Sequence, residues 1–310
     1  MTETILLTIG TRGSPLALAQ AHETAGLLAA THHVPRGKIA IRVIKTSGDM
    51  IQDRALSEAG GKGLFTKELD EALLRGEIDA GVHSAKDLPT AMPPGIAVAG
   101  YLTREDVRDV LISARATSIA GLPPGGTMGT ASLRRAAQVR RLRPDLKTVL
   151  LRGNVETRLR KVQAGEFDAT LLALAGMKRL GLAHHATAIL PLHEFLPACG
   201  QGAVAITLRR DDDATAAAFA PVYHADTGHA LTAERAILDV LDGSCRTPIA
   251  GLAVMEGGML RFQGQVLAPD GSAMFEFAAS AVPEQAMLLG TAAGQDILRR
   301  MPVGFMTQTG

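Results

Sequence analysis

Val82-His83-Ser84-Ala85-Lys86-Asp87-Leu88-Pro89 is the stretch from which the fold can be read. It continues the short apolar run of residues 78–81, and Pro89 pushes the residue before it into extended geometry, so the segment cannot continue as a helix. We therefore expect Asp87 at the carboxyl end of a strand, the edge of an open α/β sheet where ligands bind. There the carboxylate, beside Lys86, could face a cationic or N–H-rich substrate. The alternative is that Asp87 only caps a turn and Lys86 is solvated.

Length and composition limit the class of protein. The 310 residues exceed what one hydrophobic core usually supports and predict two or three domains. A content of 46% hydrophobic and 20% charged residues is typical of a soluble globular chain. The N-terminus has no basic region, and the apolar run 5–9 is too short for a signal core or a membrane span, so we expect a cytoplasmic protein without membrane contact. The two cysteines, Cys199 and Cys245, lack the spacing of a zinc site or a disulfide framework.

Positive charge is concentrated in residues 131–161, where ten lysines or arginines stand against two acidic residues, although the whole chain carries only +1. Nucleic acid is the first partner to consider for such a cluster. However, the stretch contains no aromatic residue and the chain has no tryptophan, which argues against a platform for base stacking. A small substrate that carries several carboxylates explains the arginines better.

The first residues of the chain predict a strand, a turn and a helix. Residues 5–9 have the pattern of a buried strand, Ser14 is a good N-cap, and Pro15 suits the first helical position. The N-terminus of this helix would offer unpaired N–H groups to an anion. A second strand is expected at 39–44 and a helix over 64–73. The polar stretch 45–63 between them is interpreted as a mobile cover over a site.

The second half of the chain echoes the first. Residues 128–132 lead into a helix as residues 9–14 do, and residues 164–169 repeat the order of residues 75–80. This repetition favours two similar α/β domains whose equivalent helix N-termini face a shared cleft.

Arg134 and Arg135 stand in the first turn of the second of these helices, directly after the N-cap Ser132. Cations there oppose the helix dipole by about 0.3–1 kcal/mol each, so a structural role would not place them at that end. An anion held by the N–H groups, the Ser132 hydroxyl and both guanidinium groups would explain them. Arg158 is expected near the edge of the buried face of the next helix. For Arg179, a surface position and a site position both stay open.

The last part of the chain predicts a small α+β domain. The glycine-rich residues 198–206 are expected to return the chain to the first domain, and the acidic run 211–213 to form a solvated turn rather than a metal site. A helix is expected from Thr232, followed by three antiparallel strands at 249–255, 259–267 and 273–279 and a covering helix around 284–299. Cys245 lies on a loop before these strands. It is either an inert filler or a thiol that reacts once to anchor another group.

Taken together, these segments resemble the porphobilinogen deaminase (hydroxymethylbilane synthase) family. The matching segments run in order from residue 9 to about residue 251: Gly10-Thr11-Arg12-Gly13-Ser14-Pro15-Leu16-Ala17-Leu18, Lys45-Thr46-Ser47-Gly48-Asp49, Gly61-Lys62-Gly63-Leu64-Phe65, His83-Ser84-Ala85-Lys86-Asp87-Leu88-Pro89, Gly129-Thr130-Ala131-Ser132-Leu133-Arg134-Arg135, Leu151-Arg152-Gly153-Asn154, Gly200-Gln201-Gly202-Ala203 and the Cys245 loop. The resemblance implies an α/β fold with two periplasmic-binding-protein-like lobes plus a small C-terminal α+β domain with a three-stranded antiparallel sheet. It implies domain 1 at 1–102 and 203–220, domain 2 inserted at 108–198, and domain 3 at 224–310.

The same resemblance implies a cytoplasmic, monomeric transferase of tetrapyrrole (haem, chlorophyll, cobalamin) biosynthesis. Such an enzyme condenses four molecules of porphobilinogen, each with loss of ammonia, into linear hydroxymethylbilane. The product grows on a dipyrromethane cofactor that a thioether attaches to Cys245, and no metal is implied. Cys199 departs from the family pattern, in which an apolar residue or proline precedes Gly-Gln-Gly; it is a second thiol, but Cys245 is favoured as the anchor.

Asp87 would be the catalytic carboxylate, facing the pyrrole nitrogens, where it stabilises positive charge and assists proton transfer. The other implied residues contact the acidic side chains of cofactor and substrate. Those implied for the cofactor are Lys86, Asp87, Thr130, Ser132, Arg134 and Arg135, and those for the substrate are Arg12, Ser14, Lys62, Phe65, Arg152, Arg158 and Arg179.

Two other functions remain open on the sequence. A two-lobed binding protein for a carboxylated ligand would share the cleft, but it predicts an export signal and gives Cys245 no use. A nucleic-acid-binding protein would use residues 131–161, and it predicts that binding falls steeply with salt.

Overall fold

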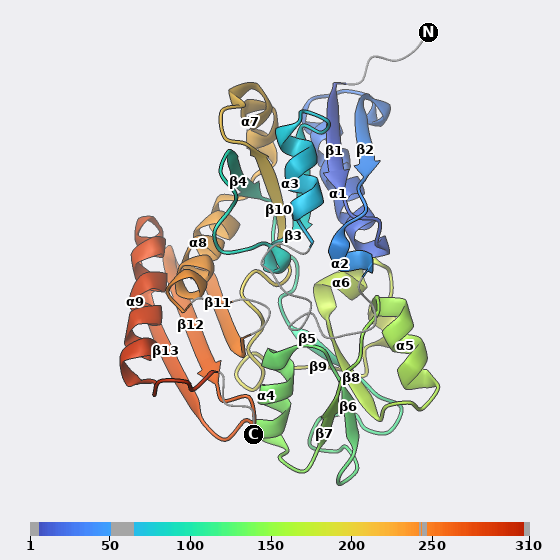
Figure 1. Ribbon diagram of the computed structural model, residues 1–310, viewed down its shortest axis with the longest axis vertical. Helices are drawn as coiled ribbons and strands as arrows, with labels where there is room; N and C mark the ends of the chain where they lie inside the picture. Colours follow the sequence, from blue (N-terminus) through green and yellow to red (C-terminus); the bar gives the residue numbers. More distant parts are fainter. Residues whose placement is uncertain (1–5, 51–64, 242, 244–246, 307–310) are drawn as a thin grey trace. The chain divides into compact units, whose positions relative to one another are not determined.

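The computed structural model describes residues 6–50, 65–241, 243 and 247–306. The chain forms two compact units, residues 1–105 with 202–228 and residues 106–201 with 229–310. Within the described residues, three sheets build these units, two with five strands and one with three (Figure 1). Lys62 and Cys245, both predicted site residues, lie outside the described residues.

The first unit contains a five-stranded sheet in the order β2-β1-β3-β10-β4. β1 is parallel to β2 and β3, whereas β10 runs antiparallel to β3 and β4. The strands are β1 (Leu7–Thr11), β2 (Ile39–Val43), β3 (Ala80–Ser84), β4 (Ile96–Tyr101) and β10 (Val204–Arg209). The chain therefore returns to this sheet after residue 201, as the glycine-rich stretch predicts.

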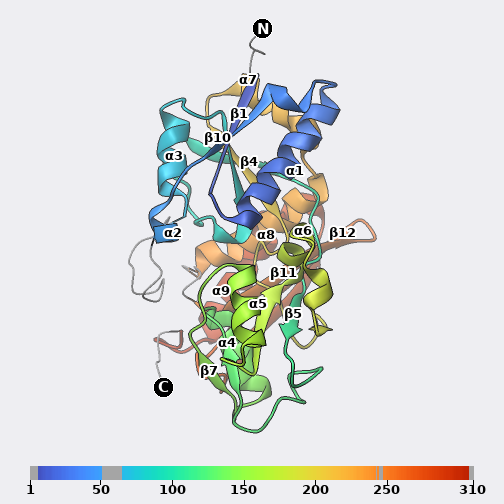
Figure 2. The same ribbon diagram turned by 90° about the vertical axis from the view of Figure 1, so that its right-hand side faces the viewer.

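Helices cover both faces of this sheet, with α1 on one side and α3 on the other (Figure 2). Helix α1 packs Ala21, Ala25 and Leu28 against Ile9 and Val82 of the strands. The helices of this unit are α1 (Pro15–Thr31), α2 (Ser47–Met50), α3 (Lys67–Leu74) and α7 (Asp213–Phe219), with the short 3-10 turns η1 (Arg36–Lys38), η2 (Ala85–Asp87) and η4 (Ala220–Val222). Helix α2 occupies the start of the stretch predicted as a mobile cover, and residues 51–64 of that stretch lie outside the described residues.

The second unit contains a sheet built on the same plan, in the order β7-β6-β8-β5-β9. β6 is parallel to β7 and β8, and β5 runs antiparallel to β8. Its strands are β5 (Asp109–Ile112), β6 (Thr127–Gly129), β7 (Lys147–Val149), β8 (Ala169–Ala173) and β9 (Ala188–Ile189). Its helices are α4 (Leu133–Leu142), α5 (Val155–Gln163) and α6 (Leu174–Arg179), with the turn η3 (Ala183–His185). Helix α4 packs in one hydrophobic cluster of this sheet, and α5 and α6 pack in the other.

Equivalent hydrogen bonds explain the echo between the two halves of the sequence. Asp79 Oδ2 accepts a hydrogen bond from the backbone N–H of Thr8 at 2.7 Å, and Asp168 Oδ2 accepts one from the N–H of Thr127 at the same distance. In both sheets a carboxylate just before one strand thus fixes the start of its parallel neighbour. The aspartate of the repeated Gly-Glu-x-Asp-Ala pattern makes this hydrogen bond in both sheets.

The second unit also contains an antiparallel three-stranded sheet in the order β11-β12-β13, as predicted. The strands are β11 (Ile249–Glu256), β12 (Met259–Leu267) and β13 (Met274–Ala281), and α9 (Ala286–Arg300) follows the turn η5 (Pro283–Gln285). Helix α8 (Ala225–Val240) begins before the predicted Thr232, because His224 Nδ1 accepts the N–H of Thr227 at 3.3 Å and starts the helix earlier. Helix α9 lies close to α8, since a Cβ on Gly290 would meet Ala233 O.

Candidate active site

Asp87 lies directly after the end of a strand. β3 stops at Ser84, and the chain turns through η2, whose Ala85 N–H donates to Ala203 O at 3.0 Å. Leu88 is extended, as its position before Pro89 requires. The side chain of Asp87 is 37% exposed. The predicted position of this carboxylate, at the carboxyl end of a strand, is confirmed.

Arg12 stands beside Asp87 because it follows β1, which is parallel to β3, so that the carboxyl ends of the two strands meet. Its Nη1 is 3.8 Å from Asp87 Oδ2. Its Cζ lies 4.0 Å from the centroid of the Phe65 ring, a cation–π contact that holds the guanidinium group in place. A carboxylate and a cation are thus presented together at this edge of the first sheet.

A small cavity of about 60 Å³ opens at the same edge. Four predicted residues line it, namely Arg12, Ser14, Phe65 and Asp87. The rest of its lining consists of Leu16, Ala17, Gln20, Thr66, Val82, His83 and Ser84. Lys86 is half-buried and is not among the described residues of this lining. The structure therefore gathers the predicted residues of the first unit, with the exception of Lys86 and of the undescribed Lys62.

Four polar side chains in the lining were missed by the sequence reasoning, those of Gln20, Thr66, His83 and Ser84. Gln20 and Ser84 hydrogen-bond to each other at 3.0 and 3.1 Å. His83 is buried with its Nε2 3.0 Å from Thr207 Oγ1. Burial, and to a lesser degree the charge of Arg12, lowers the pKa of His83 to about 4, so this ring is neutral at physiological pH. The signal in the sequence was a glutamine within the apolar stripe of α1.

Asp70 is a second buried ionisable group of the first unit that the sequence did not point out. It lies on α3 and is 5% exposed. Burial raises its pKa to about 6, because the charged carboxylate loses its hydration there.

In the second unit, the predicted residues Thr130 and Ser132 shape the start of α4. Ser132 Oγ accepts the N–H of Arg135 at 3.4 Å, so Ser132 is the N-cap, and the N–H of Ser132 itself donates to Thr130 Oγ1 at 3.1 Å. The Ser132 hydroxyl, which the sequence predicts as part of an anion site, therefore also caps helix α4.

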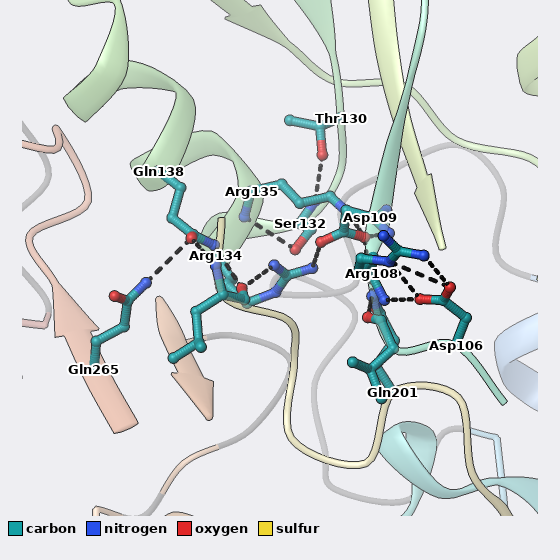
Figure 3. Close-up of polar contacts among 12 residues, drawn as sticks. Asp106, Arg108, Asp109, Thr130, Ser132, Arg134, Arg135, Gln138, Gln201 and Gln265 are labelled. Atoms are coloured by element: carbon teal, nitrogen blue, oxygen red, sulfur yellow. Dashed lines mark hydrogen bonds and ion pairs between the residues drawn. The ribbon is translucent and has the colours of Figure 1, made fainter. Parts of the chain in front are cut away.

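Arg134 and Arg135 both bind one buried carboxylate, that of Asp109 (Figure 3). Arg134 Nη2 donates to Asp109 Oδ2 at 2.8 Å and Arg135 Nη2 to Asp109 Oδ1 at 2.7 Å. Burial by itself raises the pKa of Asp109, but the two guanidinium charges outweigh it and hold the pKa well below its usual range. The expectation that no structural role would place cations at this helix end is wrong, because both arginines have a structural partner in the buried carboxylate of Asp109.

The arginines of the second unit nevertheless form a group with excess positive charge. Arg158 is half-buried, and its Nε donates to the backbone carbonyl of Gly153 at 2.9 Å. Burial, followed by the charges of Arg135 and Arg152, lowers the pKa of Arg158 to about 10. The charges of Arg135 and Arg152 therefore disfavour the charged form of Arg158, and an anion among the three side chains would offset this effect. Arg179, half-buried, is the last residue of α6, where the helix dipole favours a cation.

Cys199 is the cysteine that the described residues contain, and it is a poor candidate for a covalent attachment. It is 6% exposed, and its Sγ would lie 2.7 Å from a Cβ on Gly251. There is consequently little room for a substituent on this sulfur, in agreement with the sequence-based preference for the other thiol.

The described residues offer no group of three or more His, Cys, Asp or Glu side chains placed to hold a metal ion. Within the acidic run 211–213, Asp212 caps α7 by accepting the N–H of Thr215 at 3.0 Å, and it pairs with Arg209. In the part of the chain that the structure describes, no helix has the length and apolar character needed to cross a membrane.

Comparisons with known proteins give a consistent result over most of the chain. One family model, described as porphobilinogen deaminase, dipyromethane cofactor binding domain, matches residues 7–217, and a second, porphobilinogen deaminase, C-terminal domain, matches residues 229–299. A porphobilinogen deaminase from Nitrobacter winogradskyi is 55% identical over 303 residues, which cover 98% of this chain and 96% of the relative. One from Nitrobacter hamburgensis is 54% identical over the same shares.

Solved structures give only distant likenesses. A periplasmic substrate-binding protein of an ABC transporter from Coxiella burnetii has 16% identity and a TM-score of 0.43, covering 70% of this chain and 91% of its own. A nutrient binding protein from Burkholderia cenocepacia bound to methionine has 15% identity and a TM-score of 0.40, covering 69% and 92%.

Proposed function

The chain belongs to the porphobilinogen deaminase family, and from this premise we propose which of its residues carry out the reaction. It is a transferase of tetrapyrrole biosynthesis, a hydroxymethylbilane synthase that joins four porphobilinogen molecules, with loss of ammonia, into a linear tetrapyrrole. Its dipyrromethane cofactor, when bound, supplies the pyrrole to which new units are added.

The donors of the second unit fit a cofactor that carries several carboxylates. Burial and then the charges of Arg135 and Arg152 lower the pKa of Arg158, and carboxylates among these three arginines would offset the unfavourable effect of the two charges on Arg158. Guanidinium groups are suited to this task because their planar donors match a carboxylate. We assign these arginines, with Arg179, Arg134, Thr130 and Ser132, to the acetate and propionate groups of cofactor and substrate. Every added pyrrole brings two more carboxylates, which accounts for the number of arginines.

Asp87 has the chemistry needed at the reacting ring. Its carboxylate is accessible, and the distance of 3.8 Å to Arg12 exceeds a hydrogen bond, so the oxygen remains able to accept a pyrrole N–H. A carboxylate there stabilises positive charge on the ring and can hold a proton as ammonia leaves. Arg12, Ser14 and Phe65, which line the same cavity, are assigned to the incoming substrate together with Lys62, and Lys86 is assigned to the cofactor.

The covalent anchor is assigned to Cys245, which lies outside the described residues. The buried setting of Cys199 supports this assignment by disfavouring the alternative thiol. A monomer in the cytoplasm, with three domains divided as the family resemblance implies, completes the proposal.

The observation that carries the assignment of roles is the accessible Asp87 carboxylate beside Arg12 in a cavity at the strand ends. Its test is Asp87→Ala, with Asp211→Ala as control, because Asp211 is an exposed carboxylate of the same unit. Intact mass should show the cofactor on the wild type and both variants, and peptide mapping should place it on Cys245. Consumption of porphobilinogen should be nearly abolished in Asp87→Ala only. Near-normal product formation by this variant would refute the role of Asp87, and an active wild type with the mass of its amino acids alone would refute the cofactor assignment.

A further inference from the structure

Asp109 is the most completely enclosed carboxylate of the arginine group. It is the first residue of β5 and is 0% exposed. Besides the two bonds described above, its Oδ1 accepts Arg135 Nε at 3.2 Å and Gln201 Nε2 at 3.0 Å. Four side-chain donors thus converge on two oxygens (Figure 3). Because Asp109 is enclosed, it is not accessible to a substrate.

The geometry of these bonds fixes Arg135 more firmly than a simple ion pair does. Arg135 approaches Oδ1 through two of its nitrogens, Nε and Nη2, so this side of its guanidinium group is turned toward Asp109. Arg135 also lies near Arg152 and Arg158, as its effect on Arg158 shows. The arginine that Asp109 holds is therefore one of the three neighbouring arginines, Arg135, Arg152 and Arg158.

Arg134 extends the same arrangement in another direction. Its Nη1 donates to the carbonyl oxygen of Leu196 at 2.8 Å, which also accepts Gln138 Nε2 at 3.1 Å. Gln138 Oε1 in turn accepts the N–H of Leu196 at 2.8 Å and Gln265 Nε2 of β12 at 3.1 Å (Figure 3). Hydrogen bonds thus connect Asp109, through Arg134 and Gln138 of α4, to Gln265 in the three-stranded sheet.

Gln201 ties Asp109 to the place where the chain enters and leaves the second unit. Its Nε2 donates to Val107 O at 2.8 Å as well as to Asp109. Residues 107 and 201 lie at the two boundaries of the segment 106–201. The carboxylate is thus held from the chain boundary on one side and from α4 on the other.

We propose that Asp109 is a positioning residue, which never touches substrate but holds the guanidinium group of Arg135 in the orientation that receives a carboxylate of cofactor or substrate. This inference rests on the carboxylate-binding role proposed for Arg135. A different account would make Asp109 a purely structural residue that only neutralises two buried cations. The two accounts differ in whether its substitution changes binding by the folded enzyme.

The test is Asp109→Asn, which keeps the size of the side chain but removes its charge and turns an amide N–H₂ toward an arginine. The control is Asp106→Asn. Asp106 is three residues earlier in the chain and also pairs with two cations, Arg108 at 2.6 Å and Lys178 at 3.9 Å, but these are not on α4. Two quantities are measured: the rate at which the cofactor-free chain gains cofactor mass from porphobilinogen, and the KM for porphobilinogen of the loaded enzyme.

For Asp109→Asn we expect cofactor uptake to slow and KM to rise, each by about tenfold or more, because misplacement of a binding group by about 1 Å costs up to about 100-fold. For Asp106→Asn both should stay within about twofold of wild type. Loss of folded protein alone lowers apparent kcat and leaves KM unchanged, so KM separates positioning from stability.

Asp109→Glu provides a second variant in case Asp109→Asn does not fold, since it retains the charge but displaces the carboxylate by one methylene. It should also raise KM. If the variants that fold show the KM and uptake rate of Asp106→Asn, the positioning role is refuted. If the wild type itself gains no cofactor mass, the proposed function fails instead, so the two failures are distinguishable.

Discussion

Replacing Gly271 by alanine should weaken the contact between helix α4 and the hairpin that joins β12 to β13. Gly271 is buried in the turn of that hairpin, with a φ of +79°. A Cβ at this position would lie 2.5 Å from Arg141 N, 2.8 Å from Ala137 O and 2.9 Å from Arg140 C. All three atoms belong to the backbone of α4, so no side-chain rotation can relieve the overlap. Either the hairpin or the helix has to move.

Two costs add up in Gly271→Ala. A left-handed conformation costs alanine about 1–2 kcal/mol, and overpacking of a well-packed contact typically costs a further 1–3 kcal/mol, so we expect about 2–5 kcal/mol in total. Gly258, in the turn between β11 and β12, is the matched control. Its φ is also +79°, but a Cβ there would meet nothing within 4 Å. Gly258→Ala should therefore cost only the conformational part, about 1–2 kcal/mol.

Urea unfolding of the two variants and the wild type measures both costs, and amide hydrogen exchange locates them. We expect Gly271→Ala to be less stable than Gly258→Ala by about 1–3 kcal/mol, and the amides of α4 to exchange faster in Gly271→Ala alone. Because α4 carries Arg135, KM for porphobilinogen should rise in the same variant. Equal destabilisation by the two substitutions, with unchanged exchange in α4, would show that the hairpin does not brace this helix.

Two further predictions concern ionisable groups whose pKa the fold displaces. Burial raises the pKa of Asp70 from 3.8 to about 6, so the folded protein favours the protonated form of this side chain. The stability that protonated Asp70 contributes is lost as the pH rises through 6. Asp70→Asn should accordingly stabilise the protein at pH 8 by about 1–3 kcal/mol and have no such effect at pH 4. Urea titrations at the two pH values measure this difference, and equal effects at both would contradict the raised pKa of Asp70. Arg158→Gln removes a cation that its neighbours disfavour, so it should leave stability unchanged or raise it by about 1 kcal/mol. The KM for porphobilinogen should rise about tenfold or more in the same variant. A variant that loses stability without a change in KM would show that Arg158 is structural.

The sequence predicted the features that depend on local patterns. β12 occupies the residues predicted for it, 259–267, because an alternating pattern and flanking glycine turns mark both its ends. Asp87 lies in the turn after a strand, and Pro89 keeps this turn from continuing as a helix. The start of α8 was placed too late, at Thr232 instead of Ala225, because its first turns carry small and polar residues and the cap is a histidine ring.

Asp109 could not be predicted in the same way. Its partners Arg134 and Arg135 are 25 and 26 residues further along the chain, and Gln201 is 92 residues away. No short-range pattern connects an aspartate at the start of one strand with a helix that begins after another. The sequence did show the unusual cations in the first turn of α4, and the buried carboxylate of Asp109 explains why they are there. It was interpreted as the mark of an external anion alone.

The two α/β sheets share one plan but present different charges to a ligand, and this difference follows from the exposure of a single carboxylate in each. In the first sheet the cation Arg12 precedes the helix, and its acidic neighbour Asp87 is 37% exposed, so a carboxylate remains accessible for chemistry. In the second, the cations follow the cap, and their acidic neighbour Asp109 is fully buried, so only positive charge is left for a ligand. Loss of Asp87 should therefore reduce turnover, whereas loss of Asp109 should reduce binding. If kcat and KM changed to the same extent in both variants, Asp87 and Asp109 would not have these separate roles in turnover and binding.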